Sequence, residues 1–270
     1  MFKLLSVLKK SPLGAYFFNN RVSTIRFGIA KGLKRKGGLG IFGLLYSEDS
    51  KEDLYIRRLP SSNKVVYDIG ANFGAFTLYF LKNSGERGRV VAFEPIKKNC
   101  DDILENVRIN KLDMNKLTVI PMGLGSNRRK ETLTFDPMNT SRASFDAAIG
   151  GQIKAVKGST QEEIEVDSLD NVIVRYSLPN PDFVKIDVEG FESEVLRGMT
   201  YLIKSARPQL LIEMHGIDEN HKQKNACDVV GFLESAGYSM FHIETECAIT
   251  KANSAAASSG HLHCTWKIAE

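Results

Sequence analysis

The stretch Val65-Val-Tyr-Asp-Ile-Gly-Ala-Asn-Phe-Gly-Ala-Phe-Thr77 decides the fold of this 270-residue chain. An apolar run ends in Asp68, a turn of small residues follows from Gly70 to Gly74, and a helical pattern begins directly after it. This succession predicts a strand, a tight turn and a helix N-terminus, the arrangement with which open α/β sheets bind a nucleotide-like ligand. Glycine suits such a turn because a Cβ atom would collide with a closely approaching ligand.

A second apolar run, Arg89-Val-Val-Ala-Phe-Glu94, comes one short helix later and ends in an acid. An acid at the end of the second strand is placed to accept hydrogen bonds from ribose hydroxyls. Glu94 therefore marks the second contact that we expect with a nucleotide-like ligand.

The spacing of the turn indicates which ligand this is. It has the form Gly70-x-x-x-Gly74, and Asn72 occupies the place of the glycine that normally lets a pyrophosphate approach. Asp68, just before the turn, would repel a pyrophosphate but suits a cationic or zwitterionic ligand. S-adenosylmethionine carries a sulfonium, an ammonium and no phosphate. It fits Asp68 near its methionine end and Glu94 on its ribose.

Short apolar runs alternate with helical patterns after about residue 60, which predicts a doubly wound, mostly parallel α/β sheet. The expected strands cover 65–69, 89–93, 117–121, 182–187, 208–214, 238–243 and 261–268. The expected helices cover 75–83, 96–110, 190–203 and 221–236. A flexible loop is expected over 252–260.

The region 130–168 breaks this alternation and is interpreted as an insertion. It predicts two extra strands, Glu131–Phe135 and Glu163–Val166, flanking a loop from Asn139 to Phe145. Because the insertion follows the third strand, we expect it at the edge of the sheet that holds the turn, where it could cover a substrate. The chain then divides into a basic, partly helical extension over 1–60 and one domain over 61–270.

Charged side chains gather at the predicted carboxyl ends of the fourth and fifth strands. Lys185 and Asp187 are two residues apart and point to the same side, as do Glu213 and His215. One interpretation is structural, with Lys185 paired to Glu213 across the sheet. The functional interpretation makes all four catalytic. His215 is the first candidate for a general base, because the ordinary pKa of histidine is near neutrality, and Asp187 is the second.

A magnesium or manganese ion held by Asp187, Glu213 and His215 is an alternative, but ligand spacing cannot be read across strands. We therefore expect no metal site. The other histidines on the last two strands are interpreted as packing residues or loop edges: His242, His261 and His263.

The net charge of +4 conceals an uneven distribution, because nine Lys and Arg residues and no acid precede Glu48. This basic leader either packs aromatic residues (Tyr16, Phe17 and Phe18) on the domain or attracts membrane lipid or an acidic glycan carrier. It matches no recognisable nucleic-acid-binding motif, so nucleic acid is not an expected partner.

The sequence predicts a cytoplasmic protein, with peripheral membrane contact through the leader as an alternative. Lys9 and Lys10 interrupt the apolar start, which argues against export, and no apolar run approaches the roughly 20 residues of a spanning helix. The scattered cysteines argue against a zinc site or a disulfide framework and fit a reducing compartment. They are Cys100, Cys227, Cys247 and Cys264.

At the level of motifs, the chain resembles the FkbM-type S-adenosylmethionine-dependent methyltransferases over about residues 60 to 245. The motifs that carry the resemblance are Asp68-Ile-Gly-Ala-Asn-Phe-Gly-Ala-Phe-Thr77, Phe93-Glu-Pro95, Asp167-Ser-Leu-Asp170, Lys185-Ile-Asp-Val-Glu-Gly-Phe-Glu192, Leu196-x-Gly198, Arg207-Pro-Gln-Leu-Leu-Ile-Glu213 and Phe232-Leu-Glu-Ser-Ala-Gly-Tyr238. The Lys-x-Asp-x-Glu-Gly element is the specific one.

The resemblance implies a Rossmann-like class I methyltransferase fold, with a seven-stranded sheet whose last strand is antiparallel. It also implies methyl transfer to an oxygen, often on sugars, polyketides or other secondary metabolites. Carried onto this chain, the cofactor-binding residues would be Asp68, Gly70, Asn72, Gly74, Thr77, Glu94 and Asp187.

Three other classes of function compete with this one. A nucleotide-binding, NAD-type oxidoreductase would need a phosphate-friendly turn, and Asp68 with Asn72 argues against that. A non-catalytic Rossmann-like module would not need the charges at the strand ends. A nucleic-acid amino-methyltransferase commonly carries an Asn/Asp-Pro-Pro-Tyr/Phe element after the fourth strand, where this chain has Asp187-Val-Glu-Gly.

Overall fold

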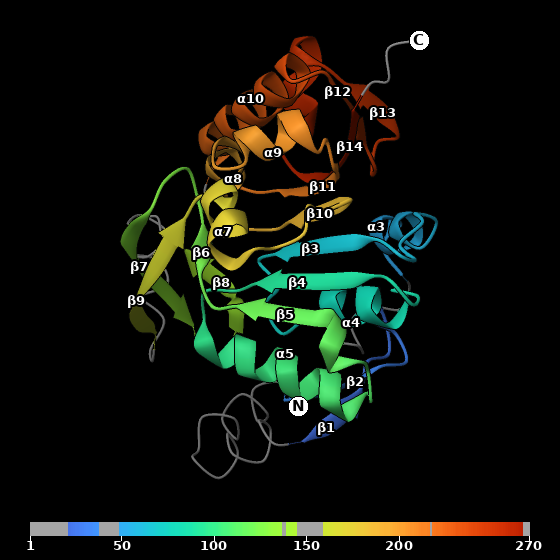
Figure 1. Ribbon diagram of the computed structural model, residues 1–270. Helices are drawn as coiled ribbons and strands as arrows, with labels where there is room; N and C mark the ends of the chain where they lie inside the picture. Colours follow the sequence, from blue (N-terminus) through green and yellow to red (C-terminus); the bar gives the residue numbers. More distant parts are fainter. Residues whose placement is uncertain (1–20, 38–48, 137–138, 145–158, 217, 267–270) are drawn as a thin grey trace, which may run out of the picture.

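The computed structural model of the chain describes residues 21–37, 49–136, 139–144, 159–216 and 218–266. Helices cover both faces of a central, mostly parallel sheet, and a smaller sheet stands beside one end of it (Figure 1). The doubly wound α/β fold predicted from the alternation of strands and helices is confirmed.

The central sheet has the strand order β13-β12-β14-β11-β10-β3-β4-β5. Its strands are β3 (Val65–Ile69), β4 (Arg89–Phe93), β5 (Leu117–Ile120), β10 (Phe183–Ile186), β11 (Gln209–Met214), β12 (Tyr238–His242), β13 (Cys247–Ile249) and β14 (Gly260–Trp266). The last strand, β14, lies antiparallel between β11 and β12, as expected. The expected count of seven strands is one too low, because the short strand β13 pairs antiparallel with β12 at the sheet edge.

Two apolar cores lie on opposite faces of this sheet because alternate residues of each strand point to opposite sides. One core joins Tyr67 and Ile69 to four helices, namely α7 (Leu169–Tyr176), α8 (Glu192–Arg197), α9 (Thr200–Ser205) and α10 (Glu219–Ser235). The other core joins Val66 and Val90 to the opposite layer, which contains α3 (Lys51–Ile56), α4 (Ala75–Lys82) and α5 (Lys97–Ile109).

Two helical segments differ from expectation. The helix expected over 190–203 is divided into α8 and α9 where the backbone of Met199 leaves the helical region, with φ of −121° and ψ of 29°. Gly198, the residue before it, packs so closely that a Cβ there would lie 1.9 Å from the carbonyl oxygen of Gly125. The loop expected over 252–260 contains the 3-10 helix η3 (Lys251–Ala257), which begins with a capping box formed by Thr250 and Asn253. A further 3-10 helix, η2 (Met114–Lys116), precedes β5.

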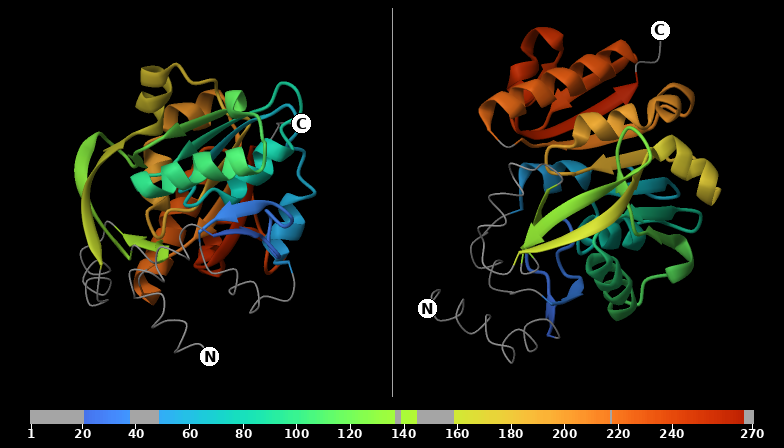
Figure 2. Two further views of the ribbon diagram at one scale, coloured as in Figure 1. Left: turned by 90° about the horizontal axis from the view of Figure 1, so that it is seen from below. Right: turned by 90° about the vertical axis from the view of Figure 1, so that its left-hand side faces the viewer.

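The insertion forms a second sheet in the order β6-β9-β7-β8, made of β6 (Gly123–Leu124), β7 (Arg129–Asp136), β8 (Asn139–Ser144) and β9 (Thr160–Asp167). The two predicted strands lie within β7 and β9, which pair antiparallel. The loop expected from Asn139 was wrong over 139–144, where β8 pairs with β7, and Phe145 lies outside the described residues. Figures 1 and 2 show this sheet at the end toward which the arrows of β4 and β5 point.

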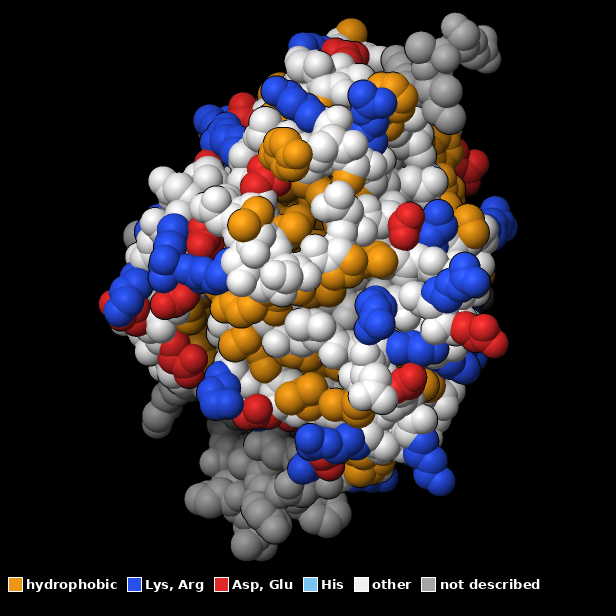
Figure 3. Space-filling model, viewed as in Figure 1, with side chains coloured by type: hydrophobic (Ala, Val, Ile, Leu, Met, Phe, Trp, Pro, Cys, Tyr) orange, Lys and Arg blue, Asp and Glu red, His pale blue; other side chains and the backbone are white. Residues whose placement is uncertain are grey.

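The described part of the extension contains a hairpin of β1 (Val22–Thr24) and β2 (Lys34–Lys36). The hairpin docks on α5, where the N–H of Lys36 donates to Asn106 Oδ1 at 2.7 Å. Tyr16, Phe17 and Phe18 lie outside the described residues, so the two interpretations of the leader remain predictions. Within the described ranges, no helix combines the length and apolarity that crossing a membrane requires. On the face shown in Figure 3, basic and acidic side chains are interspersed around a more hydrophobic middle.

Candidate active site

The turn between β3 and α4 is held against the ends of both neighbouring strands. The N–H groups of Gly70 and Ala71 donate to the carbonyl oxygen of Phe93 at 3.0 and 3.1 Å. Gly70 has a φ of +77°, and a Cβ there would lie 1.8 Å from the carbonyl oxygen of Asp187. Only glycine fits this position, so the turn and the residue after β10 are brought into direct contact.

Glu94 lies at the end of β4 and is bonded to the turn. Its carboxylate accepts hydrogen bonds from the N–H of Asn72 at 2.8 Å, the N–H of Ile96 at 2.9 Å and the side-chain amide of Asn99 at 3.1 Å. Burial raises the pKa of Glu94 to about 7, although these three hydrogen bonds act to lower it. The predicted ribose acceptor therefore changes charge near neutral pH.

Asp68 is fully buried behind the turn. Its Oδ2 accepts a hydrogen bond from Thr77 Oγ1 at 2.6 Å, and its Oδ1 has no hydrogen-bond partner among the described residues. Burial raises the pKa of Asp68, and Lys185, its partner in the register between β3 and β10, acts to lower it. Gly74 begins α4 with a φ of +89°. The structure thus places Asp68, Gly74 and Thr77 in the support of the turn.

A pocket lies where β3, β4 and β10 end, with about 730 Å³ of space including open solvent. Four of the predicted cofactor-binding residues line it: Gly70, Asn72, Glu94 and Asp187. Asp68, Gly74 and Thr77 are outside this lining. Leu133 of β7 and Leu124 of β6 contribute apolar surface, so the second sheet forms part of the wall.

Lys185 forms a buried ion pair with Asp187. Its Nζ donates to Asp187 Oδ2 at 2.7 Å and lies 4.2 Å from the centre of the Phe76 ring. Burial acts to lower the pKa of Lys185, but Asp187 and Asp68 outweigh it and leave the pKa above its usual value. The structural interpretation, in which Lys185 pairs with Glu213, is wrong, because Asp187 is the partner within ion-pair distance.

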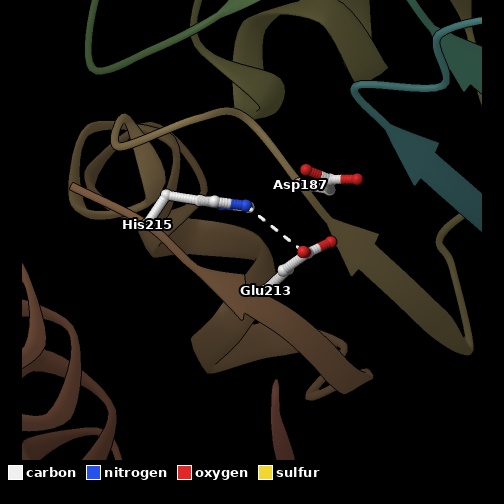
Figure 4. A group of neighbouring side chains, drawn as sticks. All are labelled: Asp187, Glu213 and His215. Atoms are coloured by element: carbon white, nitrogen blue, oxygen red, sulfur yellow. Dashed lines mark ion pairs between the residues drawn. The ribbon is translucent and has the colours of Figure 1, made fainter. Parts of the chain in front are cut away.

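His215 follows β11 and points at Glu213, with Nε2 3.2 Å from Glu213 Oε1 (Figure 4). Its Nδ1 lies 3.2 Å from Oε1 of Glu192, a carboxylate with no exposed surface. Asp187 approaches from the loop after β10, and one donor atom each of Asp187, Glu213 and His215 lies within 4.8 Å of the others. The tertiary structure therefore brings together the four residues of the predicted catalytic set.

The expectation of an ordinary pKa for His215 is wrong. Burial acts to lower the pKa, but hydrogen bonds with Glu192 and Glu213 and the charges of Glu189 and Asp187 raise it to about 11. A histidine with that pKa holds a proton at neutral pH and cannot accept another. In the ion-free protein His215 is therefore a cation among carboxylates, which argues against its predicted role as the general base.

Glu189 is a site residue that was not among the predicted catalytic side chains. It lines the pocket, and 43% of its side chain is exposed. Its φ of +52° is unusual for a residue with a side chain and indicates a constrained loop. Loss of surrounding water raises its pKa to about 7, against the charge of His215, which acts to lower it. The Lys-x-Asp-x-Glu-Gly element of the sequence contains Glu189 and could have indicated that it belongs to the site.

His261 belongs to the same charged cluster, so its interpretation as a packing residue or loop edge was wrong. Its Nδ1 contacts Glu244 Oε1 at 2.5 Å, and its Nε2 lies 3.1 Å from Glu52 and 3.6 Å from Glu213. Burial acts to lower its pKa, but these carboxylates raise it to about 12. Glu213 therefore lies between two protonated imidazoles. By contrast, His242 is buried and packs as expected, bonded to Thr245 and Ser259.

Comparison with known proteins gives one family match. The model of the "Methyltransferase FkbM domain" matches residues 68–240. "Hexuronic acid methyltransferase AglP" of Haloferax volcanii is 30% identical over 184 residues, which are 68% of this chain and 65% of that protein. "Methyltransferase sdnD" of Sordaria araneosa is 28% identical over 57% of this chain and 68% of that protein.

A solved structure of methyltransferase FkbM from Methylobacillus flagellatus KT is 19% identical, with a TM-score of 0.49, and covers 80% of this chain. The match spans 50% of that solved chain. This chain thus spans about two thirds of the length of the curated relatives and half of the solved one.

Proposed function

The chain belongs to the FkbM methyltransferase family, and we propose that it transfers a methyl group from S-adenosylmethionine to a hydroxyl oxygen of a sugar, glycan or secondary metabolite. The observation that carries the proposal is the acidic pocket at the carboxyl edge of the sheet. It joins the glycine turn and Glu94 on one side to Asp187 and Glu189 on the other.

The charge of the pocket fits this cofactor. Glu94, Asp187 and Glu189 line the pocket, and no basic residue is among the described residues that do. Carboxylates attract a sulfonium and an ammonium and repel a pyrophosphate, which argues against an NAD-type dinucleotide. Oδ1 of Asp68, which has no hydrogen-bond partner in the described part of the chain, adds a further buried acceptor behind the turn.

The residues that would hold the cofactor follow from their positions in the pocket. Glu94 would accept hydrogen bonds from ribose hydroxyls, Gly70 and Asn72 would let the backbone approach, and Asp187 would face the methionine end. When bound, S-adenosylmethionine supplies a methyl group that is electrophilic because it is attached to a positively charged sulfur.

Glu189 is the group that we assign to take the proton of the acceptor hydroxyl. It lines the pocket next to Asp187, and its exposed side chain can reach an acceptor that enters from solvent. A positioned base of this kind typically contributes about 10²–10⁴-fold to the rate. Lys185 orients Asp187, and Glu213 with His215 completes the charged wall beside it.

The acceptor class rests on similarity and on the position of the second sheet. The Haloferax volcanii relative is named for methylation of a hexuronic acid, which supports a sugar as the acceptor. Leu124 and Leu133 add apolar surface beside the carboxylates, a combination that suits the alternating C–H and O–H surface of a sugar ring.

Two measurements test the proposal. Calorimetry should detect S-adenosylmethionine binding and no NAD binding; the reverse result would establish the oxidoreductase alternative. Cell extract divided into glycan, lipid, nucleic-acid and small-molecule fractions should then accept radiolabelled methyl groups in the glycan or small-molecule fraction. Label confined to nucleic acid would reject the acceptor class, and cofactor binding without transfer to any fraction would indicate a non-catalytic module.

A further inference from the structure

Three metal-ligating atoms converge beside the pocket, one each from Asp187, Glu213 and His215, all within 4.8 Å of one another. Any three points that lie within 4.8 Å of one another have a common point no more than about 2.8 Å from each of them. One ion could therefore lie that close to all three atoms. A Mg²⁺ ion needs oxygen ligands at about 2.1 Å, so shifts of less than about 1 Å would complete the contacts. Figure 4 shows the three side chains directed into the same space.

The separation of two of these donors also fits one ion. His215 Nε2 and Glu213 Oε1 are 3.2 Å apart. Adjacent ligands of an octahedral ion with bonds of about 2.1 Å lie about 3.0 Å apart, because they subtend a right angle. The pair is therefore spaced as two neighbouring ligands would be.

The surroundings orient these donors as in known metal sites. The fully buried Glu192 lies 3.2 Å from Nδ1 of His215 and is itself fixed by Asn225 at 2.6 Å and by the N–H of Gly190 at 2.9 Å. A carboxylate on the far nitrogen of a histidine is the usual support of a metal-binding imidazole, since it directs the other nitrogen to the ion. The carboxylate of Asp187 is also held in place, because Nζ of Lys185 donates to its Oδ2 at 2.7 Å.

The local charge favours a cation. Four carboxylates surround the single imidazole of His215: Asp187, Glu189, Glu192 and Glu213. Lys185 neutralises one of them. Partly buried charges of one sign are costly unless opposite charge lies among them. In the ion-free protein the proton on His215 supplies this charge, and a divalent ion that replaces the proton would supply it instead.

We propose that Asp187, Glu213 and His215 bind one divalent cation, Mg²⁺ or Mn²⁺, at the edge of the pocket. Two carboxylates and one imidazole suit these ions, and three protein ligands leave coordination positions open to acceptor hydroxyls. Its catalytic role rests on the proposed function: a bound ion would lower the pKa of an acceptor hydroxyl, and Glu189 would take the proton. The binding of the ion does not depend on that function.

Manganese binding to the full chain tests the site without cofactor or acceptor. After treatment with EDTA, the chain is titrated with Mn²⁺, and free ion is followed by electron paramagnetic resonance. We expect one ion per chain, displaced by excess Mg²⁺, and at least tenfold weaker binding in Asp187→Asn and in Glu213→Gln. Glu246→Gln, which removes a carboxylate that is 70% exposed, is the control and should bind normally. Circular dichroism confirms that each variant is folded.

Spectroscopy and activity give independent results. Pulsed measurements on the Mn²⁺ complex should show coupling to an imidazole nitrogen, which His215→Gln removes. The absence of saturable binding, or unchanged binding in Asp187→Asn and Glu213→Gln, would overturn the site. Full methyl transfer in EDTA would overturn its catalytic role. Mn²⁺ binding that needs these residues, in a chain without methyl transfer, would uphold the site and reject the proposed function.

Discussion

The ammonium group of Lys185 lies 2.7 Å from the carboxylate of Asp187, yet the two side chains differ sharply in exposure. The lysine side chain is 2% exposed and the aspartate side chain 25% exposed. The ammonium group of Lys185 is therefore buried in the sheet, while the carboxylate that it orients faces the pocket. One strand, β10, thus joins the interior of the sheet to the candidate site.

Replacing Lys185 by methionine should destabilise the protein strongly. The substitution leaves Asp68 and Asp187 without their buried cation, and breaking such a pair typically costs about 3–5 kcal/mol. Urea unfolding measures the change. Lys64→Met is the matched control, because Lys64 pairs with Asp182 at 3.7 Å with both side chains over 40% exposed, and its loss should cost less than about 1 kcal/mol. Equal losses would contradict a buried ion pair.

Gly70→Ala should destabilise the turn more than strain alone explains. The new Cβ would meet the carbonyl oxygen of Asp187 at 1.8 Å, at a φ of +77°. Gly32→Ala is the control, since Gly32 has a φ of +86° and nothing within 4 Å of the new atom. Left-handed strain costs roughly 1–2 kcal/mol at both sites, and overpacking adds about 1–3 kcal/mol at Gly70. Thermal unfolding and cofactor titration should separate them; indistinguishable variants would contradict the close contact.

The binding of S-adenosylmethionine should release protons near pH 7. Burial raises the pKa of Glu94 from 4.5 to about 7, so the free protein is largely protonated there at pH 6. A cationic ligand with ribose hydroxyl donors favours the carboxylate, so binding lowers this pKa and affinity rises from pH 6 to pH 8. Calorimetry in buffers of different ionisation enthalpy measures the number of protons released on binding. Glu94→Gln should bind at least tenfold more weakly and lose this release; unchanged release in the variant would assign the protons elsewhere.

Glu189→Gln should separate catalysis from cofactor binding. The amide cannot accept the acceptor proton, so kcat should fall by about 10²–10⁴-fold. The affinity for S-adenosylmethionine should fall much less than kcat, because Glu94 and Asp187 still line the pocket. Single-turnover methyl transfer and calorimetry provide the two readouts. The exposed Glu246→Gln serves as the control for loss of a carboxylate. Normal turnover in Glu189→Gln would exclude Glu189 as the base.

The order of strands and helices was predictable because it depends on local patterns. The runs Val65–Ile69 and Arg89–Phe93 became β3 and β4 with the expected bounds, since continuous apolar segments next to glycine or acidic turns have few alternatives. The division into α8 and α9 was not predictable. It lies where Gly198 packs against Gly125, a residue 73 positions away, and no local pattern records that contact.

The turn around Gly70, the acid Glu94 and the class of cofactor could be inferred from the amino-acid sequence, because each follows from the order of residues along one or two strands. How the charges act depends on the tertiary structure. It places Asp187, Glu213 and His215 within 4.8 Å, surrounds His215 with carboxylates that raise its pKa to about 11, and brings His261 of β14 to Glu213. Charges interact through space, and the distances across β10, β11 and β14 exist only once the sheet has formed.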